Sequence, residues 1–526
     1  MRLVSAYTPL LPVAVVVCSI LATLAPAAFA ASDSFEAYRL QQRQGAQKIL
    51  SEFHEYKESQ DREFSDFLKA QWREFDTFQG KVRIKEPKPR HPPVVIPPVQ
   101  KPPPEIPAPE KTPGSRGEPS PERPVHAPAV APAVVEPRIE PPPPPPQPKP
   151  LLVSGDTLQL SFYGNTISFQ YDPGWKEYRL PRGGDKPAAM SAFWTMMSGS
   201  KYEPAIESVD SARRELKLDD WGHVTLWRDA VQAIQPGRIA EQNLLLWYFL
   251  IKSGYDVRLG YAGSDIHLFV AIKQQVFSTK FTRVGAQTYY AALAPDRGDS
   301  IGSFYTYEAS YPVRLKPLEL ANASTGFTKP VSAQRSLTFT YRGKTINLNA
   351  PYDRRLVQYL GSFPQSEFEV YYDTDSSQLL RQALLGELKK HIATMSEEDA
   401  VNFLLAFVQN AFAYKTDKEQ FGYEKYFFVE ESFFFPYSDC EDRSVLFAWL
   451  VHELVGNKMI GLVYPGHMTT GVALKQAKPG YSTVMHNGTR FVIADPTYIG
   501  ASVGMAMPSY AKLKPKRIVE IPQPGS

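Results

Sequence analysis

The sequence predicts an α+β fold made of two consecutive units, each with helices packed on antiparallel sheet, preceded by a helical segment and a proline-rich linker. Three observations predict it. Strand and helix patterns of residues 151–330 recur in residues 331–526. Each region contains an apolar run of helix length followed by two runs of strand length. About half of the 48 prolines fall between residues 85 and 150, ahead of both units.

Residues 1–30 have the features of a signal peptide. Arg2 gives a basic start, residues 10–24 are mostly apolar, and Ala28-Phe29-Ala30 has the small-x-small pattern of a cleavage site. A membrane anchor is the alternative, but the apolar run is short and interrupted by proline. We therefore expect an exported chain, periplasmic or secreted, without a membrane span after cleavage.

Residues 31–84 form a predicted amphipathic helix. Between residues 32 and 80, aromatic residues recur mainly at steps of three and four and are separated by charged ones. Such a stripe is expected to fold back as a hairpin, to self-associate or to dock on a partner protein. Its members are Phe53, Tyr56, Phe64, Phe67, Trp72, Phe75 and Phe78.

Residues 85–150 form a predicted linker. The stretch includes "KPPPEIPAPEKTPG" and "PPPPPPQPKP" and has hardly any aromatic residues. Polyproline extends by about 3.1 Å per residue, so this segment reaches on the order of 200 Å when fully extended. We expect it to act as a spacer.

The repeat within residues 151–526 predicts that both units share one topology. "LQLSFYGNTISFQYDPGW" and "LTFTYRGKTINLNAPYDR", which begin 179 residues apart, each alternate apolar and polar residues across a glycine turn, as β-hairpins do. Further on, each unit has a buried helix, a strand ending in Tyr-x-Gly and a second strand. The two Tyr-x-Gly glycines are 203 residues apart. The second unit therefore holds an extra aromatic-rich stretch, residues 415–437, which we expect to be either a lid or additional core.

Cys440 is the candidate nucleophile. The other of the two cysteines, Cys18, lies in the predicted signal peptide, so the mature chain has one thiol and no internal disulfide. Asp439 and Asp442 fit the capping positions of a helix that begins at Cys440. The helix dipole favours the thiolate, whereas these carboxylates and Glu441 oppose it. We expect the dipole and a histidine to prevail.

His467 and Asp495 complete a candidate triad. His467 lies where one predicted strand ends and the next begins, and Asp495 ends a later strand immediately before a proline. A nucleophile, a base and an orienting carboxylate are the components of acyl transfer. Three other histidines of this unit fit less well because they lie in a lysine-rich helix, far along the cysteine helix or in a hairpin turn: His391, His452 and His486.

These residues resemble the transglutaminase-like (papain-like) superfamily. "SDCEDRSVLFAWLVHELVG", "PGHMTTGVAL" and "FVIADPTYIG" match its cysteine, histidine and aspartate motifs in order and in approximate spacing. The resemblance covers roughly residues 390–500, although His467 is followed by Met-Thr where many members have Ala-Trp. It implies that Cys440 attacks an amide carbonyl, that His467 moves the proton and that Asp495 orients the imidazole. Our candidates for a side-chain oxyanion donor are Gln409 and Tyr414.

The first unit has no triad. Aligning the turn glycines of the two units places Ser264 at the position of His467, Gly237 near that of Cys440 and Ala292 near that of Asp495. Since this unit has no cysteine, it cannot perform thiol chemistry, and we expect it to be a docking domain or a structural platform.

The sequence therefore predicts an exported thiol-dependent amide hydrolase, a cysteine peptidase acting on proteins, peptides or cell-wall peptides. The alternatives are a cross-linking transglutaminase and a non-enzymatic binding scaffold. The net charge of +3 gives no indication of nucleic-acid binding. We expect neither a metal nor another cofactor, because "DTDSSQ" lacks the glycine and glutamate of a calcium loop and no phosphate loop is evident.

Overall fold

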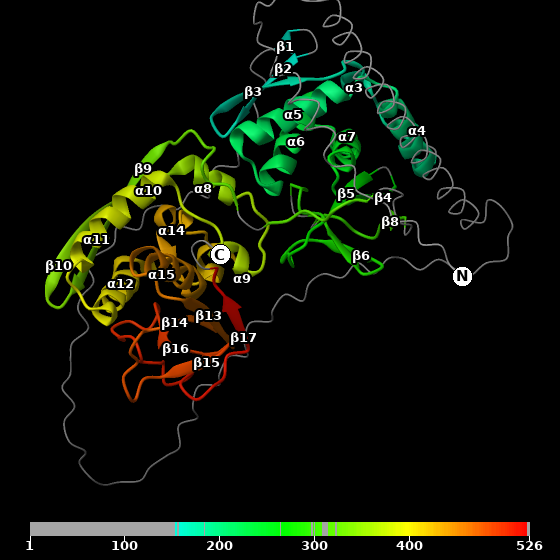
Figure 1. The fold of residues 1–526 in the computed structure, drawn as a ribbon. Helices are drawn as coiled ribbons and strands as arrows, with labels where there is room; N and C mark the ends of the chain where they lie inside the picture. Colours follow the sequence, from blue (N-terminus) through cyan, green and yellow to red (C-terminus); the bar gives the residue numbers. More distant parts are fainter. Residues whose placement is uncertain are drawn as a thin grey trace, which may run out of the picture. The chain divides into compact units, whose positions relative to one another are not determined.

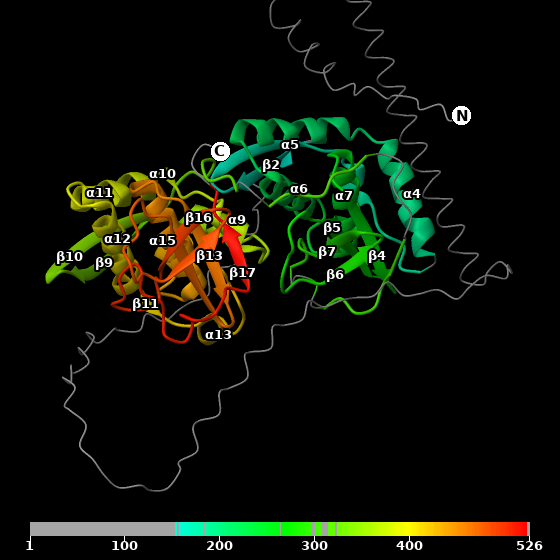
Figure 2. The same cartoon turned by 60° about the horizontal axis from the view of Figure 1, so that its bottom comes forward.

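The computed structural model describes residues 153–522, apart from 155–156, 184, 264, 296–297, 299, 308–313 and 321–322. The predicted signal peptide, aromatic helix and linker lie outside the described residues. The described part is a mixed α+β structure with two five-stranded antiparallel sheets and their helices (Figures 1 and 2). No helix in this part combines the length and apolarity needed to cross a bilayer.

A three-stranded sheet opens the described chain. Its hairpin joins Phe162 to Asn165, and the turn residues Tyr163 and Gly164 both have positive φ, as a two-residue β-turn between twisted strands requires. The predicted first hairpin is thus confirmed. The elements of this region are β1 (Val153–Ser154), β2 (Thr157–Phe162), β3 (Asn165–Gln170), α3 (Gly174–Glu177), α4 (Lys186–Ser198), α5 (Glu203–Leu216) and α6 (Asp220–Ile234).

The first five-stranded sheet packs against α7 (Ile239–Lys252). Residues 244–251 of this helix are all buried, since it is apolar around its whole circumference. It contacts the two central strands, β4 and β5. The strand order is β6-β7-β5-β4-β8. The strands are β4 (Val257–Ala262), β5 (Asp265–Ala271), β6 (Phe281–Val284), β7 (Gln287–Tyr290) and β8 (Tyr305–Thr306).

A long hairpin and a series of helices follow. The strands β9 (Ser332–Tyr341) and β10 (Lys344–Asp353) pair over their whole length and confirm the second predicted hairpin. Phe339 on β9 packs edge-on against Phe403 and Phe407 of α12. The helices are α8 (Arg354–Leu360), α9 (Phe368–Tyr372), α10 (Gln378–Leu380), the π-turn η1 (Arg381–Leu385), α11 (Gly386–Ile392) and α12 (Glu397–Ala411).

The second five-stranded sheet packs against α15 (Cys440–Leu454), which contacts β13 and β14 (Figure 1). Its order, β15-β16-β14-β13-β17, repeats that of the first sheet. The strands are β13 (Met459–Tyr464), β14 (His467–Val472), β15 (Thr483–His486), β16 (Thr489–Ala494) and β17 (Arg517–Glu520). The first four begin exactly 202 residues after β4, β5, β6 and β7 respectively.

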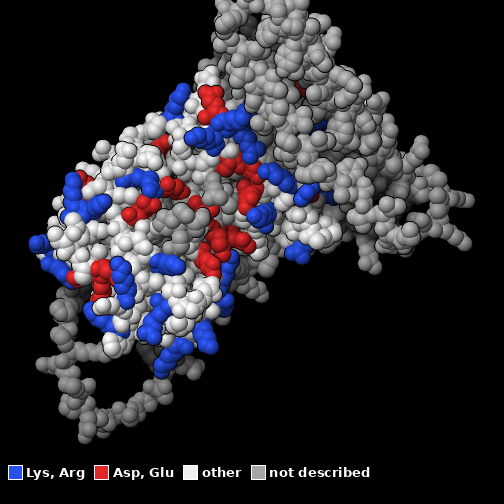
Figure 3. Space-filling model, in the orientation of Figure 1, with Lys and Arg blue, Asp and Glu red and all other residues white. Residues whose placement is uncertain are grey.

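The insertion before α15 has short elements of its own. The strands β11 (Ala413–Tyr414) and β12 (Tyr437–Ser438) flank it and pair in parallel, and between them lie α13 (Asp417–Gln420) and α14 (Glu431–Phe434). On the molecular face in Figure 3, acidic and basic side chains are interspersed over the described residues, with no continuous basic band.

Candidate active site

Cys440 is the first residue of α15, as predicted. The capping interaction is also present, because the Asp439 N–H donates to Asp442 Oδ2 at 3.2 Å. The thiol is buried and packs with Met468 and Val519. The backbone N–H of Met468 acts on the Cys440 sulfur and favours its anion. Since Met468 directly follows His467, the nucleophile lies at the start of β14.

His467 and Asp495 form the pair that the sequence predicts. Nε2 of His467 lies 2.8 Å from Oδ2 of Asp495, and both side chains are buried. The antiparallel pairing of β14 with β16 brings together the start of one strand and the end of the other. A proton on Nε2 donated to Asp495 leaves Nδ1 as the nitrogen that exchanges a proton with the nucleophile.

Neighbouring groups hold this pair in place. Oδ1 of Asp495 accepts hydrogen bonds from the Thr497 N–H at 3.0 Å, the Thr497 hydroxyl at 2.7 Å and the Tyr498 N–H at 3.2 Å. The His467 ring stacks on Tyr510, with the ring centroids 4.7 Å apart. The carboxylate and the imidazole therefore have fixed orientations.

The thiol itself is not activated in this structure. Cys440 Sγ donates to Glu441 Oε2 at 2.8 Å. Burial, followed by the charges of Glu441 and Asp439, raises the pKa of the Cys440 thiol well above its ordinary value. The prediction that the helix dipole and a histidine prevail over the carboxylates is thus wrong for this state. The proton stays on the sulfur, which donates it to Glu441.

Three buried carboxylates form an acidic cluster beside the thiol. One oxygen each of Asp417, Asp439 and Asp442 lies within 4.8 Å of the others, close enough to hold one metal ion, and three carboxylates suit a hard cation such as Ca²⁺. Oδ1 of Asp439 is buried without a hydrogen-bond partner. Burial is also the main reason why the pKa of Asp417 rises to about 8 and that of Asp439 to about 9.

The sequence analysis missed this cluster, because Asp417 comes from the insertion, 22 positions before Asp439. The parallel pairing of β11 and β12 brings the two segments together. The acidic residues on both sides of Cys440 were the sequence feature that could have indicated this cluster.

The second part of the insertion, residues 427–435, forms additional core. Phe427, Phe428, Phe433 and Phe435 are each 1–2% exposed. Phe427 stacks on Phe435 with centroids 4.7 Å apart. The guanidinium of Arg335 donates to the carbonyls of residues 432 and 436 and holds the end of the insertion against β9.

The two oxyanion candidates have different environments. The Gln409 amide donates to the carbonyls of Asp495 at 2.9 Å and Ala501 at 3.1 Å, so it positions the Asp495 loop and is not available to an oxyanion. Tyr414 is half exposed, and its strand pairs beside the residue that precedes the α15 cap. Burial, followed by the negative charges of Cys440, Asp439 and Glu441, raises the pKa of the Tyr414 hydroxyl. Tyr414 is therefore the remaining candidate donor.

The first half carries different residues at the triad positions. With the constant shift of 202 residues, Asp265 corresponds to His467 and Leu293 to Asp495. Ile239 begins α7 as Cys440 begins α15. The sequence alignment was wrong by one or two residues: it placed Gly237, Ser264 and Ala292 there, and Ser264 lies outside the described residues. The conclusion that this half has no thiol nucleophile is unaffected.

Comparisons of the chain with protein-family models, curated proteins and solved structures find no match. The functional assignment therefore depends on the geometry of the site and on the sequence motifs.

Proposed function

We propose that the protein is an exported thiol-dependent amide hydrolase, a cysteine peptidase whose triad is Cys440, His467 and Asp495. The observation that carries this proposal is the buried hydrogen bond of 2.8 Å between His467 and Asp495, formed at the start of the strand against which the cysteine packs. We also infer that each five-stranded sheet and its helix form a transglutaminase-like unit, of which the second is catalytic. Export follows from the signal-peptide pattern of residues 1–30.

The first chemical step makes the acyl-enzyme. The Cys440 proton passes to Nδ1 of His467, and the thiolate forms a bond to the carbonyl carbon of the amide. The tetrahedral intermediate then collapses, the carbon–nitrogen bond breaks, and the imidazolium gives its proton to the leaving amine. Asp495 stabilises the imidazolium and orients the ring so that Nδ1 faces the reacting sulfur and the leaving amine.

The second step releases the product. His467 takes a proton from water as the oxygen attacks the thioester carbonyl, and the thiolate leaves and is reprotonated. The backbone N–H of Cys440 and the Tyr414 hydroxyl are the proposed donors to the oxyanion in both steps.

Before it can react, the Cys440 thiol must break its hydrogen bond to Glu441. Its hydrogen bond at 2.8 Å holds the proton on sulfur. We propose that substrate binding turns the sulfur from Glu441 toward His467. This gives a latent enzyme whose free form reacts slowly with alkylating agents.

A non-enzymatic binding scaffold is the second candidate, favoured by the raised pKa of Cys440. Its weakness is the buried His467–Asp495 pair, which a scaffold does not need. Burying an ionisable pair costs free energy that an apolar pair would not.

Hydrolysis of a library of internally quenched peptides, including cell-wall stem peptides, tests the proposal. We expect cleavage by the wild type and its loss in Cys440→Ser and His467→Ala. His452→Ala, at the other end of α15, is the matched control and should retain cleavage. A primary amine added to the assay identifies acyl transfer, because a transglutaminase would incorporate it into the product. If neither hydrolysis nor acyl transfer occurs, the non-enzymatic binding scaffold is the candidate that remains.

A further inference from the structure

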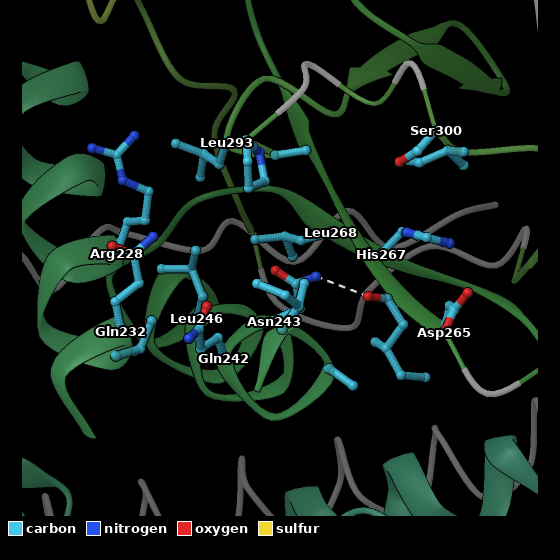
Figure 4. Close-up of a pocket in the computed structure, with 17 residues that line it drawn as sticks. Arg228, Gln232, Gln242, Asn243, Leu246, Asp265, His267, Leu268, Leu293 and Ser300 are labelled. Carbon is cyan, nitrogen blue, oxygen red and sulfur yellow. Dashed lines mark hydrogen bonds between the residues drawn. The ribbon is translucent and has the colours of Figure 1, made fainter. Parts of the chain in front are cut away.

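A cavity of about 400 Å³ lies in the first half of the described chain. It is bordered by α6, the start of α7, the start of β5 and the segment after β7 (Figure 4). Figure 4 shows Leu268 and Asn243 near the middle of the view, with Arg228 on one side and Asp265 on the other. The lining is thus mainly aliphatic, with polar side chains such as Gln242 and Asn243 among the apolar ones and charged groups on two sides.

This cavity lies where the first half carries the residues equivalent to the candidate triad of the second half. Ile239, Asp265 and Leu293, which correspond to Cys440, His467 and Asp495, all line it. A contact between helix and strand supports the correspondence independently. Asn243 Nδ2 donates to the Ile266 carbonyl at 2.8 Å. At the matching place, Ser444 Oγ lies 3.5 Å from the Met468 carbonyl, although its shorter hydrogen bond, 2.7 Å, goes to the Cys440 carbonyl.

The substitutions at the triad positions change the chemistry that this part of the first half can perform. Isoleucine and leucine replace the nucleophile and the orienting carboxylate, so the site cannot form an acyl-enzyme. Leu293 is buried, whereas Ile239 is 49% exposed at the edge of the cavity. A large exposed apolar side chain beside an apolar hollow is a feature of binding sites for apolar groups.

We propose that the cavity binds an extended peptide through an aliphatic side chain, without cleaving it. The inference rests on the proposed function, because the equivalent place in the second half is where a peptide amide would lie. The aliphatic side chains of the lining receive the aliphatic side chain of the peptide. Asp265 adds a negative charge at the exposed edge of this lining. The first half thereby holds one part of a polypeptide while the second half cleaves another.

Fluorescence anisotropy of Cys440→Ser tests this without any need for turnover. The probes are fluorescein-labelled twelve-residue peptides of glycine, serine and lysine with one central Leu, Ala or Asp. We expect the Leu peptide to bind tightest and the Asp peptide weakest. Ile239→Arg in the same background should weaken binding of the Leu peptide about tenfold, and Asp265→Lys should weaken it less. Met485→Arg, which changes another exposed apolar residue (59%) on the second sheet, is the matched control.

The inference is overturned if no peptide binds, if Leu and Asp peptides bind alike, or if Ile239→Arg and Met485→Arg have the same effect. Equal melting temperatures of the variants exclude misfolding as the cause. Failure of the proposed function is separate, because it appears as absent hydrolysis by the wild type. Peptide binding lost in Ile239→Arg would then still establish the cavity as a binding site.

Discussion

Replacing Glu441 by glutamine should activate the Cys440 thiol. In the wild type the thiol donates to this carboxylate at 2.8 Å, and the Glu441 charge, after burial, is the largest cause of the raised thiol pKa. Two unit charges about 4 Å apart interact by about 4 kcal/mol at an effective dielectric constant of about 20. Burial also raises the pKa of Glu441, so we take the full interaction as an upper limit. We therefore expect about one to two units of decrease in the thiol pKa, at about 1.4 kcal/mol per unit.

The assay is the rate of iodoacetamide alkylation against pH, in buffer with EDTA so that no cation neutralises the acidic cluster. Below the thiol pKa the rate follows the thiolate fraction, so Glu441→Gln should react about 10- to 100-fold faster than wild type at pH 7. Glu453→Gln is the control, because it removes a carboxylate twelve residues further along the same helix. A rate in Glu441→Gln no higher than in Glu453→Gln would refute the electrostatic reasoning.

Four further predictions follow from the site. Asp495→Asn should lower kcat by about 10²- to 10⁴-fold with little change in KM, as expected when the imidazole loses its orienting carboxylate; equal kinetics would contradict this role. Tyr414→Phe should lower kcat about 10- to 100-fold at unchanged melting temperature, because it removes one half-exposed oxyanion donor. Gln409→Ala should cost about 1–3 kcal/mol in chemical denaturation, because it leaves the buried carbonyls of the Asp495 loop without donors, whereas the exposed Asn410→Ala should cost far less. Asp439→Asn should raise the melting temperature at pH 8 and by much less at pH 5. The folded-state pKa of about 9 exceeds the unfolded value, so the wild type loses stability as the pH rises from about 4 toward 9; a larger gain at pH 5 would contradict the sign.

The main elements of the site could be predicted from the sequence because local chemistry determines them. The capping pattern around Cys440 indicated where α15 begins. The turn before His467 and the proline after Asp495 indicated where β14 begins and β16 ends. These signals depend on neighbours within a few positions, which periodicity and turn residues reveal.

Other parts of the site depend on contacts distant in sequence or on side-chain rotamers. Nothing local shows that the Cys440 thiol turns to Glu441, or that Asp417 joins a cluster 22 positions later. The role of Gln409 depends on carbonyls almost ninety residues away. Such contacts are fixed by packing, which residue patterns do not reveal.

The error in the first half has a specific cause. The alignment matched the turn glycines, but Gly263 directly follows β4, whereas Pro465 separates Gly466 from β13. Matching the glycines therefore shifts the strand register by one residue. Since side chains alternate across a sheet, one residue of shift exchanges the two faces, and Asp265 was overlooked for that reason.

The central claim, that Cys440 is a nucleophile served by His467 and Asp495, is tested most directly by capturing the acyl-enzyme. The protein is incubated with N-acylated amino-acid p-nitrophenyl esters, quenched in acid and mapped by mass spectrometry. The account predicts an acyl group on Cys440, formed at least 100-fold more slowly in His467→Ala and at an unchanged rate in His452→Ala. An unmodified Cys440, or equal acylation in the wild type and His467→Ala, would contradict it.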